Sequence, residues 1–134
     1  MLELKLFTLE EANRLLPELS TLIERLRDLQ EAVAKKEIEI DALELVSDRE
    51  SPMESPAVIK EVEGLNQLIS DFNATVDRIH SHGCFLKDME MGLIDFYTLQ
   101  EGRVVYLCWR YGEDEVRFWH EVGAGYASRQ SLGE

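Results

Sequence analysis

The sequence is poor in the features that mark membrane, exported and nucleic-acid-binding proteins. Its 134 residues include two cysteines, three prolines and 14 basic residues against 27 acidic ones, for a formal net charge of −13. Charges recur too often for a run of about 18 apolar residues that could span a bilayer. The start of the chain has neither the basic residues nor the apolar core of a signal peptide, and excess acid repels phosphate backbones. We expect a cytoplasmic protein with no membrane and no nucleic-acid partner.

The composition is that of a folded protein. Apolar residues make up 45% of the chain and charged residues 31%, which excludes intrinsic disorder. A length of 134 residues predicts a single domain, residues 1–134. The cysteines, Cys84 and Cys108, match no zinc-finger or redox spacing. Since disulfides are rare in the cytoplasm, we expect two free thiols.

Residues 1–82 carry the apolar period of two paired helices. Thr8 and Glu11 fit a capping box that starts a helix near Leu9, and Pro17 predicts a kink or restart near Leu16. Apolar residues then follow alternating three- and four-residue steps: Leu19, Leu22, Leu26, Leu29, Val33, Ile40 and Leu43. Lys36 is the one polar residue at a position of this apolar stripe. After a loop over residues 47–55, the same period runs from Pro56 to Gly83: Val58, Val62, Leu65, Ile69, Phe72, Val76 and Ile79. We expect a long, coiled-coil-like antiparallel hairpin.

Residues 83–134 change to the pattern of a β-sheet module with an irregular C-terminal tail. Two strand-like runs, 93–99 and 104–110, flank a tight turn at Glu101-Gly102. With Gln100 opposite Arg103, paired residues sum to 203, which sets the following neighbours: Asp95 with Cys108, Tyr97 with Tyr106, Phe96 with Leu107, and Ile94 with Trp109. Residues 116–121 form a third strand or a short helical turn. The fold class is therefore α+β, a helical hairpin followed by an antiparallel sheet of about three strands.

The register of the segment 116–121 stays open at this point. A four-residue loop would set Arg110 opposite Arg117, which like-charge repulsion disfavours. A loop that is one residue longer or shorter avoids this contact, and either shift places His120 on the face of the sheet that carries Cys108.

The sequence of the C-terminal part resembles that of a family of small, uncharacterised bacterial proteins, a domain of unknown function. The residues that carry the resemblance are Lys87-Asp88, Gly92 to Phe96, Leu107 to Glu113, Trp119-His120-Glu121 and Gly125 to Gln130, together with Phe7 to Asn13 and Leu15-Leu16-Pro17. The resemblance spans nearly the whole chain. It implies no activity, cofactor or catalytic residue.

One group of residues has the chemistry of a metal site. Asp95, Cys108 and His120 would bring a carboxylate, a thiol and an imidazole onto one sheet face, and these groups are ligands for zinc or another borderline metal. The same residues also fit a buried apolar cysteine beside a hydrogen-bonded core pair. Cys108 as a nucleophile activated by His120 would need an oxyanion site, which nothing in the sequence marks. No other cofactor is predicted.

A second group suits a ligand site. Aromatic side chains provide contact area for a ligand, arginines bind its carboxylate or phosphate groups, and carboxylates accept hydrogen bonds from its donors. The candidates are Arg110, Glu113, Trp119, His120, Glu121 and Arg129. Packing of large side chains onto the helices, with arginines in ion pairs at the rim, is the competing interpretation.

Two functional hypotheses follow. In the first, the protein is a non-enzymatic homodimer that assembles through its helices, since two apolar stripes about 40 Å long exceed what the sheet can shield. Its sheet then binds a small ligand or a protein partner. In the second, the protein is a small metal-dependent or hydrolytic enzyme that uses His120 with Cys108, Asp95 and Glu113. The sequence alone does not decide between them.

Overall fold

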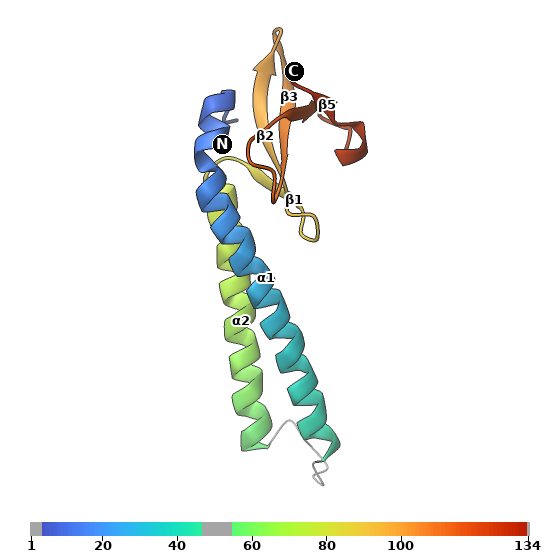
Figure 1. Ribbon diagram of the computed structural model, residues 1–134. Helices are drawn as coiled ribbons and strands as arrows, with labels where there is room; N and C mark the ends of the chain where they lie inside the picture. The colour runs from blue at the N-terminus through green and yellow to red at the C-terminus, as the bar shows by residue number, and fades with distance from the viewer. Residues whose placement is uncertain (1–3, 47–54, 134) are drawn as a thin grey trace. The chain divides into compact units, whose positions relative to one another are not determined.

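The computed structural model describes residues 4–46 and 55–133 and shows an α+β protein (Figure 1). Two helices that pack together, α1 (Leu9–Leu45) and α2 (Pro56–Ser81), precede an antiparallel sheet whose strand order follows the chain. Its strands are β1 (Phe85–Asp88), β2 (Leu93–Gln100), β3 (Arg103–Arg110), β4 (Phe118–His120) and β5 (Gln130–Ser131), with a short 3-10 helix, η2 (Tyr126–Ser128), before β5. Residues 47–54 of the predicted loop lie outside the described residues.

The predicted helix boundaries are confirmed. The Thr8 amide donates to Glu11 Oε1 at 2.8 Å and the Glu11 amide donates to Thr8 Oγ1 at 3.1 Å, which is the reciprocal capping box. Beyond the end of α2, Gly83 has a φ of +94° and its amide donates to the His80 carbonyl at 2.9 Å. A side chain at Gly83 would also meet Lys5, since a Cβ there would lie 2.8 Å from Lys5 Cδ. Glycine is therefore required at this position.

The predicted restart of the first helix near Leu16 is wrong. Helix α1 runs without interruption through Pro17. Proline removes one amide donor and crowds one carbonyl, but these losses act on a single turn. Leu16 and Leu19 on either side are buried, so the packing of the apolar stripe holds the helix together across that turn.

The chain divides into two compact units, one formed by the residues up to Ile23 and from Asp77 onward, the other by Glu24 to Val76. In the second unit, Leu26, Leu29 and Ile40 of α1 and Val58 of α2 are buried. Lys36, the polar residue in the predicted apolar stripe, joins the helices because its Nζ lies 2.6 Å from Oε2 of Glu61 on α2. The same Nζ lies 3.1 Å from Oε2 of Glu39 on its own helix. Within this unit, apolar contacts and the ion pair of Lys36 with Glu61 hold the two helices together.

The register of the central hairpin agrees with the prediction at every position. Asp95 pairs with Cys108, Tyr97 with Tyr106, Phe96 with Leu107 and Ile94 with Trp109. Glu101 and Gly102 have φ values of 51° and 81°, as a two-residue turn that matches the strand twist requires.

The open register of the third predicted strand is settled by β4. Tyr106 pairs with His120 and Cys108 with Phe118, so paired residues sum to 226. This is the register with one residue fewer in the loop, which avoids Arg110 opposite Arg117. His120 therefore lies on the Cys108 face.

The sheet has five strands, not about three, and the tail is not wholly irregular. Strand β1 has four residues, with a register shift between Leu86 and Asp88, and β5 has only two residues, both exposed. Segments of this length carry too few alternations to stand out in a sequence. Their pairing depends on neighbouring strands that are already in place, namely β2 for β1 and β4 for β5.

In the unit that contains the sheet, one sheet face packs against the N-terminal segment of the chain. Phe7 meets Phe96 edge to face with ring centroids 5.2 Å apart, and the buried Trp109 shares that face. Asn13 of α1 joins the two layers, since its Oδ1 accepts the amide of buried Val116 at 2.7 Å. The opposite face carries Asp95, Cys108 and His120.

We predict that Asn13→Ala lowers the free energy of unfolding by about 1 to 3 kcal/mol, because it leaves the buried Val116 amide without an acceptor. Asn13→Asp keeps an oxygen at the same place and is the control. Urea denaturation measures both variants. Equal losses of stability in the two variants would show that the hydrogen bond is not what Asn13 contributes.

Candidate functional site

The central feature of the second sheet face is a buried contact between a histidine and an aspartate. His120 Nε2 lies 3.1 Å from Asp95 Oδ2, and both side chains are 3% exposed. The other ring nitrogen, Nδ1, lies 2.9 Å from the carbonyl oxygen of Glu121. Strands β2 and β4 supply the two residues from either side of β3.

The hydrogen bonds of the ring fix where the protons lie. A carbonyl oxygen can only accept, so His120 Nδ1 must carry a hydrogen. A neutral ring then has a lone pair at Nε2, and a lone pair cannot face a carboxylate oxygen at 3.1 Å without a proton between them. The pair therefore holds one proton at this contact and is neutral as a unit.

Burial explains why this neutral state is preferred. Desolvation raises the pKa of Asp95, while the charge of His120 opposes this shift. The second carboxylate oxygen, Asp95 Oδ1, is buried and has no hydrogen-bond partner. An unpaired buried oxygen is uncommon and costly, so it singles out this position as one that packing alone does not explain.

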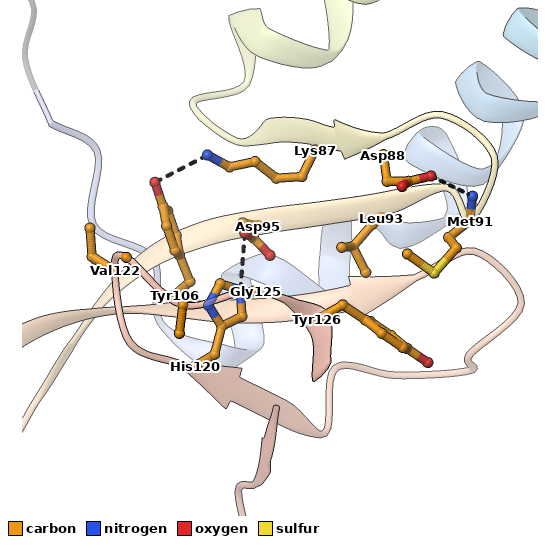
Figure 2. A pocket seen from close by; sticks show the side chains of 12 residues that line it. Lys87, Asp88, Met91, Leu93, Asp95, Tyr106, His120, Val122, Gly125 and Tyr126 are labelled. Atoms are coloured by element: carbon orange, nitrogen blue, oxygen red, sulfur yellow. Dashed lines mark hydrogen bonds and ion pairs between the residues drawn. The ribbon is translucent and has the colours of Figure 1, made fainter. Parts of the chain in front are cut away.

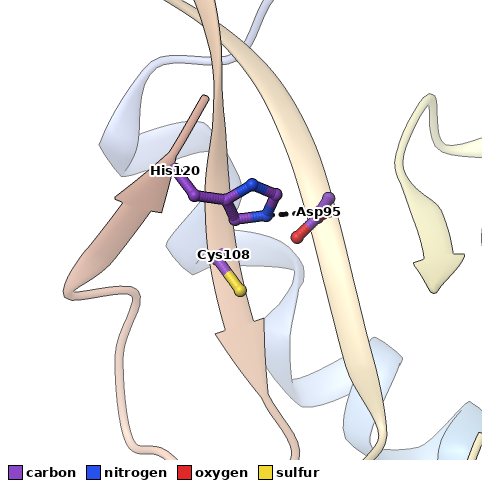
Figure 3. Close-up of side chains that lie close together, drawn as sticks. All are labelled: Asp95, Cys108 and His120. Carbon is purple, nitrogen blue, oxygen red and sulfur yellow. Dashed lines mark hydrogen bonds and ion pairs between the residues drawn. The ribbon is translucent and has the colours of Figure 1, made fainter. Parts of the chain in front are cut away.

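Cys108 lies beside this pair, opposite Asp95 in the β2–β3 register. Its Sγ, a carboxylate oxygen of Asp95 and a ring nitrogen of His120 all lie within 4.8 Å of one another (Figure 3). Burial, together with the adjacent Asp95 charge, raises the pKa of the Cys108 thiol to about 12. Both cysteines are buried and form no disulfide, as predicted. Because both nitrogens of His120 have other partners, the arrangement does not favour Cys108 as a nucleophile activated by His120.

A pocket of about 460 Å³ opens above this pair (Figure 2). Asp95 and His120 line it together with Lys87, Tyr106 and Tyr126. Its remaining lining residues come from the end of β1, from the β1–β2 turn, from β2 and from the C-terminal segment, residues 121–133: Asp88, Met91, Leu93, Val122, Gly123, Ala124 and Gly125. This volume suits a small organic molecule.

The polar groups around the pocket are tied to one another. Lys87 Nζ lies 3.4 Å from Tyr106 Oη and 4.9 Å from the centre of the Tyr106 ring. Tyr106 stacks on Tyr97, whose hydroxyl it contacts at 3.1 Å. Asp88 Oδ1 accepts the Met91 amide at 2.9 Å. These contacts link Lys87 to Tyr106 and Asp88 to Met91 within the lining.

Three of the predicted ligand residues come together over Tyr126. Arg129 binds Glu113 through two contacts of 2.9 and 3.2 Å, and its guanidinium carbon lies 4.5 Å from the centre of the Tyr126 ring. Arg110 donates to Tyr126 Oη at 3.2 Å and, through its backbone amide, to Glu113 Oε1 at 2.8 Å. These residues hold the C-terminal segment in place and so position Tyr126 at the pocket.

The other predicted ligand residues do not share this place. His120 lines the pocket, but Glu121 pairs with Arg103. Trp119 lies on the opposite sheet face from His120, as its pairing with Leu107 shows, and the Arg103 guanidinium carbon is 5.9 Å from its ring centre. Glu113 is occupied by Arg129 and the Arg110 amide, so it does not join Asp95, Cys108 and His120.

Several lining residues were missed in the sequence. Tyr106 could have been found, since the register that sums to 203 places it on the Cys108 face. Lys87 could not, because its strand, β1, was not predicted. Tyr126 belongs to the tail that was expected to be irregular, where no periodicity indicates a direction.

The proton assignment predicts effects of different size on stability for two substitutions. Asp95→Asn offers an amide hydrogen to His120 Nε2 and should change the free energy of unfolding by no more than about 1 kcal/mol. His120→Ala leaves a buried carboxyl without its partner and should cost about 3 to 5 kcal/mol. Chemical denaturation at neutral pH measures both. If the two variants lose equal stability, the pair does not hold its proton as assigned.

Comparison with known proteins gives one finding. A family model described as an uncharacterised conserved protein, DUF2203, matches residues 5–132. No curated protein and no solved structure matches the chain. Within the described residues, neither helix has a stretch that is long and apolar enough to cross a membrane.

Proposed function

The chain belongs to the DUF2203 family, and we propose that it is a homodimeric binding protein that takes a small organic anion into the pocket of its sheet face. The observation that carries the proposal is the place of the Asp95–His120 pair. A pair that served packing alone would be sealed in the core, whereas this one is buried and still lines a pocket of about 460 Å³.

The lining indicates the chemistry of the ligand. Lys87 is the only basic side chain among the lining residues apart from His120, and its ammonium group is next to the Tyr106 hydroxyl. In a chain with a net charge of −13, a basic side chain at the pocket gives an anion a local point of attraction. Leu93, Met91 and Val122 offer apolar contact to the rest of the molecule. A small carboxylate with an aromatic or aliphatic body fits both features.

We expect Lys87→Gln to weaken the binding of such carboxylates about tenfold, since it removes a charge-assisted contact at an exposed side chain. A panel of small aromatic and aliphatic carboxylates, screened by thermal shift and then by calorimetry, provides the probes. Lys35→Gln makes the same change of charge on an exposed residue of α1 and is the control. The proposal fails if no carboxylate binds, or if both lysine variants bind equally well.

The helical unit supports the homodimer. An apolar groove of about 180 Å³ lies between Val33 of α1 and Ile69 and Phe72 of α2, with Gln30 at its side. Ile69 is 41% exposed and Ile38 is 69% exposed. A second copy presents the same groove, and two hairpins together make a four-helix bundle in which such side chains are covered.

We predict that Ile69→Asp converts a dimer into a monomer at concentrations on the order of 10 µM. Because Ile69 is partly exposed in one protomer, the charge should disturb assembly more than folding. Leu99→Asp, at a side chain that is 58% exposed on β2, is the control and should remain dimeric. Light scattering measures the mass. A monomeric parent protein would contradict the proposed assembly.

A further inference from the structure

Three neighbouring strands bring a carboxylate, a thiol and an imidazole to one point on the sheet. Asp95 comes from β2, Cys108 from β3 and His120 from β4, and Figure 3 shows the three side chains converging. We propose that they bind a divalent metal ion of the zinc class at the floor of the pocket. Zinc prefers this combination of nitrogen, sulfur and carboxylate oxygen, whereas magnesium and calcium prefer oxygen alone.

The hydrogen bonding of His120 already matches that of a metal ligand. Metal-bound histidines usually donate their second ring N–H to a carbonyl or carboxylate, which fixes the ring and its tautomer. Here Nδ1 donates to the Glu121 carbonyl at 2.9 Å. The lone pair of Nε2 is therefore directed at Asp95, where a metal ion would take the place of the shared proton.

The second observation is the unpartnered oxygen of Asp95. Oδ1 is buried without a nitrogen or oxygen hydrogen-bond partner, in a residue that is 2% exposed. Apart from His120, the side chain that interacts with Asp95 as a hydrogen-bond donor is the Cys108 thiol, a weak one. If Asp95 served only as the partner of His120 in the core, leaving Oδ1 without a hydrogen bond would lower the stability of the fold. In a metal site, the second oxygen is available to coordinate the ion or to accept from a water bound to it.

The charges also balance. A divalent ion with the carboxylate of Asp95 and the thiolate of Cys108 makes a neutral centre, and a coordinating thiol loses its proton to the metal. The nearest cations are Arg129 and Lys87. Arg129 makes two contacts with Glu113 and also interacts with the Cys108 side chain, and Lys87 extends to the Tyr106 hydroxyl.

The spacing requires a small contraction. The three ligand atoms lie within 4.8 Å of one another, whereas ligands about 2.0 to 2.3 Å from a tetrahedral zinc ion are about 3.3 to 3.8 Å apart. Side-chain rotations that move the ligand atoms by about 1 Å would bring them to the spacing of a zinc site. Three protein ligands leave a fourth position, and since Asp95 and His120 line the pocket, that position faces it. The site stands independently of the proposed organic ligand.

Equilibrium dialysis of chelator-treated protein against zinc, with elemental analysis, tests the site directly. We expect one zinc ion per chain. Cobalt, a spectroscopic substitute, should give a thiolate-to-cobalt charge-transfer band in the near ultraviolet, because Cys108 is a ligand. Cys84→Ser is the matched control, since Cys84 is the other buried thiol and lies outside the cluster. This variant should keep both the stoichiometry and the band.

Two variants locate the ion. Cys108→Ser should abolish the cobalt band, and Asp95→Asn should weaken zinc binding at least tenfold while the fold, followed by circular dichroism, persists. Absence of stoichiometric zinc, absence of the band in the parent protein, or unchanged zinc binding in Asp95→Asn would each overturn the proposal. If Cys108→Ser does not fold, the cobalt spectrum of the parent protein and the Asp95→Asn measurement still decide.

Discussion

The sheet face depends on one buried contact, between His120 Nε2 and Asp95 Oδ2. Either side chain without the other would destabilise the fold, because each is only 3% exposed. An isolated buried charge or an unpaired buried polar group costs several kcal/mol, which is comparable to the total free energy of unfolding of a small domain. The pair satisfies both groups only while β2 and β4 keep their register across β3. A slip of β4 by one residue would turn His120 to the other face and replace it with Trp119 or Glu121.

The C-terminal segment extends this constraint beyond the strands. The Glu121 carbonyl that orients His120 begins the segment, and Arg129 completes it by lying between two aromatic rings, 3.8 Å from the centre of Phe118 and 4.5 Å from that of Tyr126. Glu113 satisfies the guanidinium from the preceding turn. The two short elements at the end of the chain, η2 and β5, are therefore fixed by side-chain contacts more than by their own length.

The sequence predicted what local chemistry controls and missed what depends on partners. The turn at Glu101-Gly102 has one favourable geometry, so counting outward from it gave the neighbours Asp95 and Cys108 correctly. Repulsion between Arg110 and Arg117 was enough to place His120 on the right face. Strand β1 was not predicted, because four residues with a register shift show no alternation of apolar and polar side chains. Lys87, which lies on this strand, was therefore missed as well. Tyr126 could not be placed, because its position is set by side-chain contacts with Arg110 and Arg129 that no periodicity in the sequence indicates.

Polar groups are distributed differently in the two compact units. Within the described part of Glu24 to Val76, Lys36 is a partly buried charge that is satisfied by carboxylates of the same helical pair. The described part of that unit also leaves large apolar side chains exposed, among them Ile38 and Ile69. On the sheet face, by contrast, a carboxylate with a free buried oxygen, an oriented imidazole and a thiol meet beneath an open pocket. A sheet face that served packing alone needs no such convergence of unlike groups, which is the reason for proposing a binding site there. The exposed apolar side chains of the helical pair are the reason for proposing association through that unit.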